Sequence, residues 1–370
     1  MWPDNYGGWA LDIGAGARGM AVHDGSCKSL LDGWLVFGWK HDLLFNTNDD
    51  RLKTSGIQRR LSMRIIRGRH NISKQDQGCV VTIGNFDGVH RGHQAILHEV
   101  NRLARKKACK SLLICFEPQP REFFEAYQAP ARLTRFREKV VQLAASGLDR
   151  LLCLQFNDDI RSLSVASFVD LLVQELEVEA LFIGDDFRFG ADRSGDYEAL
   201  KAAGGEFGFD VDKFSTITHG QERISSTLIR QHLEAGRFAE AEQLLGRPYA
   251  ITGRVVFGRQ LGRTIGTPTA NIQLHRYRAP ISGVFLVELK AAGSAYHGVA
   301  NVGVRPTVEQ DDIAPILEVH LLDFSGDLYG SQVEVTFTKK IREEQKFDGL
   351  DALKSAIEQD IATARRLLTD

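Results

Sequence analysis

The sequence predicts an α/β domain built on a parallel sheet, followed by a smaller antiparallel β domain that ends in a helix. Short apolar, β-branched runs alternate with helical periodicity from residue 79 onward, which favours a parallel sheet covered by helices. The pattern changes at Gly246 and Pro248, beyond which short strands and turn residues predominate. Apolar residues at helical spacing then close the chain.

Each expected element is identified by the spacing of its apolar residues and by the glycine or proline residues that end it. In the α/β domain we expect strands at 79–83, 111–116, 151–156 and 180–183, and helices at 92–107, 136–146 and 168–176. In the β domain we expect strands at 251–257, 284–289, 296–302, 317–322 and 332–337. One face of the last helix is formed by Leu350, Leu353, Ile357, Ile361 and Leu368, and this face should pack on the barrel or sandwich that the strands form.

Residues 1–62 differ from the rest of the chain. All four tryptophans lie within the first 39 residues, and no periodicity persists before Met63. We interpret 1–62 as an extension that is disordered or outside the fold, with a translation start at Met63 or a small extra domain as alternatives. A GxGxxG pattern at 14–19 lacks the strand and helix that a dinucleotide site needs. The predicted domains are therefore 63–246 and 247–370.

Composition excludes several classes of protein. The 370 residues carry a net charge of −2, which gives no electrostatic case for binding nucleic acid or an anionic membrane. No apolar run approaches the roughly 20 residues of a membrane helix, and no basic segment begins a secretory signal. The five cysteines form no CxxC pair, which is typical of reduced thiols in a cytoplasmic protein.

The densest motif ends at His93, where an expected strand gives way to a helix. In an open α/β sheet this junction lies at the carboxyl edge, where ligands bind. Three glycines spaced four apart would let backbone approach a phosphate, and a helix N-terminus supplies unpaired N–H groups. His90 and His93 can project to one side of the first helical turn, where imidazoles can donate hydrogen bonds to a triphosphate.

This motif, GNFDGVHRGH, resembles the signature of the HxGH nucleotidyltransferases, specifically the bacterial bifunctional riboflavin kinase/FAD synthetases. Further matching segments are FEPQPRE at 116–122, LTRFREK at 133–139, FIGDDFRFG at 182–190 and ISSTLIR at 224–230. The resemblance implies a Rossmann-like sheet on which the FMN phosphate attacks the α-phosphorus of ATP, with Mg²⁺ present, and expels pyrophosphate. Many relatives have His and Asn where this chain has Gln119 and Asp186, which leaves those two contributions open.

The resemblance also implies roles for particular residues. His90 and His93 would stabilise the transition state. The candidate ATP-binding residues of this domain are Gly84, Asn85, Phe86, Asp186, Ser226, Thr227 and Arg230. Asp186 would contact nucleotide or flavin, and Arg230 would pair bidentately with phosphate. Residues 225–227 could instead cap the helix that follows, and both roles can hold because they share one geometry.

A second motif lies in the predicted β domain. Gly258, Gly262 and Gly266, mixed with arginines, suit a loop over ATP phosphates, although glycine spacing alone is weak evidence. Thr269 and Asn271 lie two apart in an extended segment, so their oxygens point to the same side and suit Mg²⁺.

The PTAN sequence at 268–271, after a GRxxGxPT lead, closely resembles flavokinases, and the match continues at 298–307 and 317–322. Flavokinases have a six-stranded antiparallel barrel, which agrees with the strand pattern. The resemblance implies that Thr269 and Asn271 bind Mg²⁺ with the ATP phosphates. Glu318 would accept the proton of the riboflavin 5′-hydroxyl as it attacks the γ-phosphorus. From alternation alone, Glu318 could equally be an outward-facing strand carboxylate.

We therefore expect a cytoplasmic enzyme, a monomer or weak homo-oligomer, that phosphorylates riboflavin to FMN and adenylylates FMN to FAD. Its substrates would be ATP, riboflavin and FMN. One alternative is an enzyme that has kept a single activity, with adenylylation the one lost. Another is a flavin-binding regulatory protein that catalyses nothing.

Overall fold

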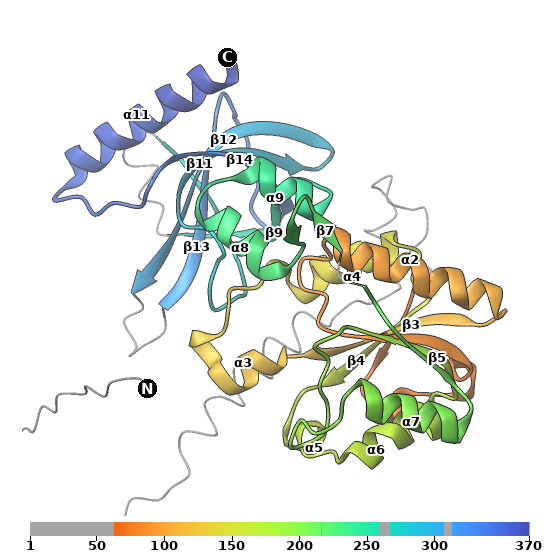
Figure 1. The fold of residues 1–370 in the computed structure, drawn as a ribbon. Helices are drawn as coiled ribbons and strands as arrows, with labels where there is room; N and C mark the ends of the chain where they lie inside the picture. Colours follow the sequence, from red (N-terminus) through yellow and green to blue (C-terminus); the bar gives the residue numbers. More distant parts are fainter. Residues whose placement is uncertain (1–62, 216, 259–266, 307–312, 370) are drawn as a thin grey trace, which may run out of the picture. The chain divides into compact units, whose positions relative to one another are not determined.

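A computed structural model describes residues 63–215, 217–258, 267–306 and 313–369 (Figure 1). The predicted extension at 1–62 lies outside the described residues, as do Gly262 and Gly266 of the predicted phosphate loop. None of the helices in the described part of the chain combines the length and the apolar character needed to cross a membrane.

The α/β part contains a six-stranded sheet in the order β1-β4-β3-β2-β5-β6, in which every neighbouring pair is parallel. The strands are β1 (Arg64–Arg67), β2 (Cys79–Ile83), β3 (Lys110–Glu117), β4 (Arg150–Gln155), β5 (Val178–Ile183) and β6 (Asp210–Lys213). The four predicted strands, now β2 to β5, are confirmed. The outer strands β1 and β6 were not predicted.

Helices cover both faces of this sheet (Figure 1). They are α2 (Arg91–Lys106), α3 (Pro120–Glu125), α4 (Phe136–Ala145), α5 (Asp158–Arg161), α6 (Val165–Asp170), a π-helical turn (Leu171–Glu175) and α7 (Tyr197–Phe207). Alternate residues of β2 face opposite layers: Val80 packs with Val100 of α2, whereas Val81 packs with Phe168 of α6. Because both faces are covered, all of β2 is buried, as in other central parallel strands.

The order of the strands places a topological switch point at the carboxyl end of β2. The chain runs from β2 to β3 and β4 on one side, then returns with β5 to the other side of β2. Ligands of doubly wound sheets bind where the direction of winding reverses in this way. The HxGH motif follows β2 and Asp186 follows β5, so both lie at this point.

The C-terminal part is a closed antiparallel barrel with the strand order β10-β13-β12-β11-β14-β9. The strands are β9 (Ala250–Val256), β10 (Ala270–Ile272), β11 (Gly283–Ala291), β12 (Ser294–Pro306), β13 (Ile313–Leu321) and β14 (Gln332–Arg342). The predicted six-stranded antiparallel barrel is confirmed, and because it is closed each of its strands pairs with two neighbours. β10 was expected only as an extended segment.

The predicted final helix is α11 (Leu350–Thr369), which packs on the outside of the barrel against β11 and β12. The predicted contact face is wrong at both ends, because Leu350 and Leu368 are 61% and 40% exposed. The barrel surface packs against the C-terminal half of the helix, where Ala364 is fully buried and Ile361 and Leu367 join the same cluster. There the Asp360 carboxylate also accepts hydrogen bonds from Nε and Nη2 of Arg342 on β14, each at 2.8 Å.

Two further helices, α8 (Ser226–Glu234) and α9 (Phe238–Leu245), connect the sheet domain to the barrel. They precede the predicted boundary at 246, but they contribute to the same hydrophobic cluster as the barrel interior. The Phe238 ring packs edge-on against Phe285 of β11, with 5.7 Å between ring centroids. The barrel core thus extends to the helices before the boundary, and the exact division of the domains stays a prediction.

Candidate active sites

The two histidines of the HxGH motif lie together at the start of α2. His90 is the N-cap residue, and its Nδ1 accepts a hydrogen bond of 3.3 Å from the backbone N–H of His93. Their rings stack with 3.6 Å between centroids, and the Phe86 ring stacks on His93 at 4.5 Å. The structure therefore brings together Phe86, His93 and His90 in one stack at a helix N-terminus, where a phosphate is favoured.

Burial determines the charge of this pair. It lowers the pKa of His90 to about 4, against a weaker opposing effect of Asp87, so the ring is neutral at pH 7. Burial lowers the pKa of His93 well below its usual value, and neighbouring His90 and Lys139 act in the same direction. Because Nδ1 of neutral His90 is an acceptor, its proton lies on Nε2. His90 can therefore offer an Nε2–H donor without carrying a positive charge.

The third residue of HxGH must be small. A Cβ at Gly92 would lie 3.1 Å from Nδ1 of His90, so glycine lets the His90 ring lie flat against the helix start. The preceding loop bends sharply, with positive φ at Phe86 (49°) and Val89 (40°) as well as at Gly88. Such values cost a non-glycine residue roughly 1–3 kcal/mol, and they concentrate at functional loops.

Several buried polar atoms near the motif lack a hydrogen-bond partner within the described ranges. They are Oδ1 of Asn85, Nδ1 of His93 and Nε2 of Gln119. Asn85 and His93 belong to the motif itself, and Gln119 follows β3, the neighbour of β2. An unsatisfied buried polar atom costs about 1–3 kcal/mol, and each one needs an explanation. A polar ligand at the carboxyl end of β2 would satisfy them.

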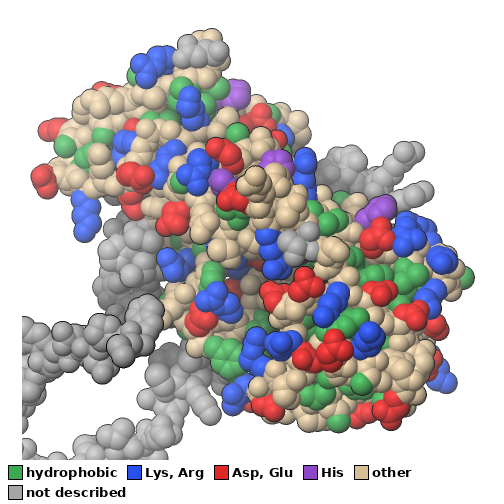
Figure 2. All heavy atoms as spheres, viewed as in Figure 1, with side chains coloured by type: hydrophobic (Ala, Val, Ile, Leu, Met, Phe, Trp, Pro, Cys, Tyr) green, Lys and Arg blue, Asp and Glu red, His purple; other side chains and the backbone are tan. Residues whose placement is uncertain are grey.

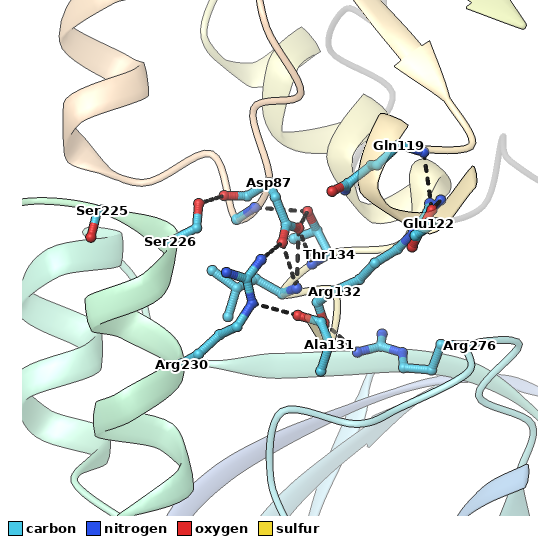
Figure 3. A network of polar contacts seen from close by, with 12 residues as sticks. Asp87, Gln119, Glu122, Ala131, Arg132, Thr134, Ser225, Ser226, Arg230 and Arg276 are labelled. Atoms are coloured by element: carbon cyan, nitrogen blue, oxygen red, sulfur yellow. Dashed lines mark hydrogen bonds and ion pairs between the residues drawn. The ribbon is translucent and has the colours of Figure 1, made fainter. Parts of the chain in front are cut away.

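Asp87 is the centre of the polar contacts that hold this loop (Figure 3). Its buried carboxylate accepts backbone N–H bonds from Leu133 and Thr134 at 3.0–3.1 Å and a 2.6 Å ion pair from Arg230. The Ser226 hydroxyl donates to the Asp87 carbonyl at 2.9 Å. Two predicted phosphate ligands, Ser226 and Arg230, thus come to the HxGH loop, and both already hold it in place.

The second candidate site lies on the outer face of the barrel. Asn271 of β10 stands directly opposite Glu318 of β13, which on its other side faces Asn301 of β12. Directly opposed residues project to the same face of a sheet. The neighbours of Glu318, Leu317 and Val319, point into the barrel core, so Glu318 faces outward with the two asparagines.

Close packing surrounds Asn271. A Cβ at Gly258, just beyond β9, would lie 2.3 Å from Nδ2 of Asn271, so glycine is required at this approach. The Thr267 hydroxyl oxygen is buried and has no hydrogen-bond partner in the described part of the chain. His320, two residues beyond Glu318, lies 3.0 Å through Nδ1 from the carbonyl of Pro268. The PTAN segment is therefore held beside Glu318.

Comparison with known proteins shows the family. Models of two families match the chain: FAD synthetase over residues 72–228 and riboflavin kinase over residues 245–368. A bifunctional riboflavin kinase/FMN adenylyltransferase from Pseudomonas fluorescens is 52% identical over 306 residues, which cover 82% of this chain and 98% of the relative. One from Escherichia coli K12 is also 52% identical, with 82% and 97% covered.

The chain belongs to the family of bifunctional riboflavin kinase/FMN adenylyltransferases. The predicted fold class and both predicted activities, successive steps of FMN and FAD biosynthesis, are confirmed. A crystal structure of a macrolide-efflux protein from Streptococcus pneumoniae is also similar, with a TM-score of 0.68 and 30% identity over 82% of this chain and 99% of that chain.

Two further residues that were predicted to bind ATP in the adenylyltransferase domain are exposed. Asp186 follows β5 and is exposed, with its carboxylate 4.0 Å from Arg223. Thr227 is exposed in the first turn of α8, whose N-cap is Ser225, so the capping role considered for 225–227 belongs to Ser225. The roles of Asp186 and Thr227 stay predictions.

Other residues near the bifunctional enzyme's sites were not singled out from the sequence. Asn301 lies within a matching segment, and only the strand register reveals that it flanks Glu318. Phe123, Phe124 and Phe156 form an aromatic cluster beyond β3 and β4, in which Phe124 is 62% exposed. The adjacent phenylalanines at 123 and 124, directly after an expected strand, were the signal in the sequence that could have indicated this cluster.

Proposed function

We propose that FMN adenylylation takes place at the Phe86–His93–His90 stack. A phosphate oxygen of FMN would attack the α-phosphorus of ATP, the new P–O bond would form, and the bond to the leaving pyrophosphate would break. The neutral Nε2–H of His90 and the His93 ring would donate hydrogen bonds to the negative charge that develops at the transferred phosphorus. The observation that carries this proposal is the stack at the helix N-terminus, beside buried atoms of Asn85 and His93 that find no hydrogen-bond partner among the described residues.

ATP would lie along the loop after β2 and the start of α8. The proposed contacts are Gly84, Asn85, Phe86, Asp186, Ser226, Thr227 and Arg230. Arg230 already donates through Nη2 to Asp87 and through Nε to the carbonyl of Ala131, both at 2.6 Å. These two bonds use two of the five N–H donors of the guanidinium, so Nη1 could contact phosphate while the ion pair with Asp87 stays in place.

Riboflavin phosphorylation would take place on the barrel at Asn271 and Glu318. Thr269 and Asn271 supply hydroxyl and amide oxygens, the hard donors that Mg²⁺ prefers, and the close packing of Gly258 fixes the Asn271 side chain. Bound Mg²⁺ would neutralise charge on the ATP phosphates. Glu318 would accept the proton of the riboflavin 5′-hydroxyl as that oxygen attacks the γ-phosphorus. The cross-strand register of Asn271 and Glu318 supports this pairing.

The two sites can be separated with single substitutions. Purified protein is incubated with ATP and Mg²⁺, and with riboflavin or FMN as the second substrate. Glu318→Gln should abolish FMN formation but leave FAD synthesis from supplied FMN, and His93→Ala should do the reverse. Matched controls are Glu334→Gln, an exposed carboxylate on β14, and His98→Ala, an exposed histidine on α2. If either active-site substitution silenced both reactions in folded protein, the two-site assignment would be wrong.

The remaining proposals concern localisation, oligomeric state, nucleic-acid binding and domain bounds, and they rest on the sequence and on the charges of the surface. We propose a cytoplasmic monomer or weak homo-oligomer that binds no nucleic acid, with domains at 63–246 and 247–370 and an extension at 1–62. On the face drawn in Figure 2, acidic and basic side chains are interspersed, which supports the absence of a nucleic-acid surface there. Sedimentation of the full chain, with and without added oligonucleotide, tests the oligomeric state and the binding together.

A further inference from the structure

We propose that Arg276, which belongs to the barrel half of the chain, is a positioning residue for FMN adenylylation. Together with Glu138 it holds the segment 131–138, and this segment in turn holds the loop that carries His90. The inference gives a role to the LTRFREK segment at 133–139, which neither proposed site uses. It rests on the proposed adenylylation site at His90 and His93.

Glu138 forms the joint between the segment 131–138 and the barrel. One carboxylate oxygen of Glu138 accepts from the backbone N–H of Thr252 (2.8 Å) and from its hydroxyl (3.1 Å) on β9. The other oxygen accepts from Nη2 of Arg276 (3.2 Å) and from the backbone N–H of Arg135 (2.7 Å). The side chains of Glu138 and Arg276 are 8% and 1% exposed. Hydrogen bonds to buried charged groups are the strong ones.

Hydrogen bonds cross this joint in both directions, from the segment to the barrel and from the barrel to the segment. The guanidinium of Arg135 donates to the barrel carbonyls of Leu274 (3.3 Å) and Thr252 (3.1 Å). In return, Nη1 of Arg276 donates to the carbonyl of Arg132 at 3.3 Å. Each half of the chain therefore places an arginine on the backbone of the other, and Glu138 lies between the two guanidinium groups.

The segment 131–138 is also hydrogen-bonded to the loop that carries His90. The backbone N–H groups of Leu133 and Thr134 bind the carboxylate of Asp87, and the Thr134 hydroxyl accepts from the backbone N–H of Gly88 at 3.0 Å. Asp87 lies three residues before His90. In Figure 3, Arg276 lies on the barrel side of the 131–132 segment and Asp87 on its other side.

Few flexible links therefore separate Arg276 from the loop that carries His90. From Arg276 to the segment and from the segment to Asp87, each contact is a direct hydrogen bond to backbone or to a buried charge. Rigid support of this kind sets the position of a reacting group, and a misplacement of 1 Å can cost about 100-fold in rate. None of the hydrogen bonds that the structure describes for Arg276 involves Asn271 or Glu318, so the kinase reaction serves as an internal control.

The test uses the full chain with three substitutions. Arg276→Met keeps the length of the side chain but removes its donors, and Arg276→Lys keeps one charged donor for Glu138. Arg365→Met is the matched control, since Arg365 forms an exposed ion pair with Asp323. We expect Arg276→Met to lower kcat for FAD synthesis from supplied FMN about tenfold, with KM for ATP and the rate of FMN formation changed less than about twofold. Arg276→Lys should recover part of that kcat, and Arg365→Met should match the wild type.

Hydrogen exchange gives an independent readout. In Arg276→Met, the amides of residues 84–94 and 131–138 should exchange faster, whereas those of β11 and β12 should not. Wild-type kcat for FAD synthesis in folded Arg276→Met would overturn the proposal, and so would parallel losses of FMN and FAD formation. If Arg276→Met does not fold, the Thr252→Val variant tests the proposal instead. It removes one donor to Glu138 and should lower only FAD synthesis, about threefold. An unchanged rate in that variant would refute the role of the joint.

Discussion

Replacing Gly92 by alanine should improve the stability of α2 and still impair FAD synthesis. The new Cβ would lie 3.1 Å from Nδ1 and 3.2 Å from Cε1 of His90, while its next neighbour, the carbonyl of Ile224, is at an ordinary 3.7 Å. The backbone at Gly92 does not need positive φ, so alanine fits the helix. Alanine is favoured over glycine in a helix by about 1 kcal/mol.

The size of the loss follows from the distance that the His90 ring must move. Ordinary contacts of a Cβ begin near 3.4 Å, so the ring has to shift by about 0.3 Å. If a misplacement of 1 Å costs about 100-fold, a shift of 0.3 Å costs about fourfold. We therefore expect at least a fourfold fall in kcat for FAD synthesis, without any fall in the free energy of unfolding.

The assay measures FAD formation from FMN and ATP, together with urea unfolding, for Gly92→Ala and for Gly205→Ala. Gly205 lies in helix α7, and a Cβ there would meet nothing within 4 Å. Gly205→Ala should gain the same helix stability and keep full activity. Wild-type FAD synthesis in Gly92→Ala would refute the idea that glycine is present to make room for the His90 ring.

Two further predictions concern the barrel site and the effect of pH. Gly258→Ala places a Cβ 2.3 Å from Nδ2 of Asn271, so FMN formation should fall about tenfold or more and require more Mg²⁺, while FAD synthesis from FMN is unchanged; Gly349→Ala, where a Cβ would meet nothing within 4 Å, is the control. Because burial depresses the pKa of His90 from 6.5 to about 4, the unfolded chain binds a proton there that the folded chain does not. Stability should therefore fall as pH drops from 6.5 towards 4, by roughly 1.4 kcal/mol per unit from this residue, with no such loss above 6.5. Urea unfolding at pH 7 and pH 5 should show a smaller difference in His90→Gln than in the wild type or in His98→Gln, and an equal difference would contradict the assignment.

Local patterns predicted most of the fold. The central strands β2 to β5 are apolar runs buried on both faces, and such runs are visible in any window of the sequence. The outer strand β6 consists of Asp-Val-Asp-Lys and is largely exposed, so its residues follow no strand pattern and only pairing with β5 makes it a strand. The three residues of β10 are likewise too few to show a period.

The proximity of some candidate site residues could be predicted for a similar reason, while their roles stay predictions. His90 and His93 are close in sequence, and so are Thr269 and Asn271, so their spacing alone indicates a shared direction. The contacts of Asp87 with Arg230 and of Glu138 with Arg276 join residues more than 130 positions apart. Contacts at such separations leave no local pattern, and only the folded chain brings them together.

The continuous apolar cluster of α8, α9 and the barrel has a consequence for the cell. Because Phe238 packs in the same interior as Phe285, a substitution that loosens this interior should melt the linker helices and the barrel in a single transition. A temperature-sensitive allele of this kind would withdraw both flavin coenzymes at once. Its growth defect should therefore match that of a strain blocked in riboflavin phosphorylation, and differ from that of a strain blocked only in adenylylation, which still makes FMN.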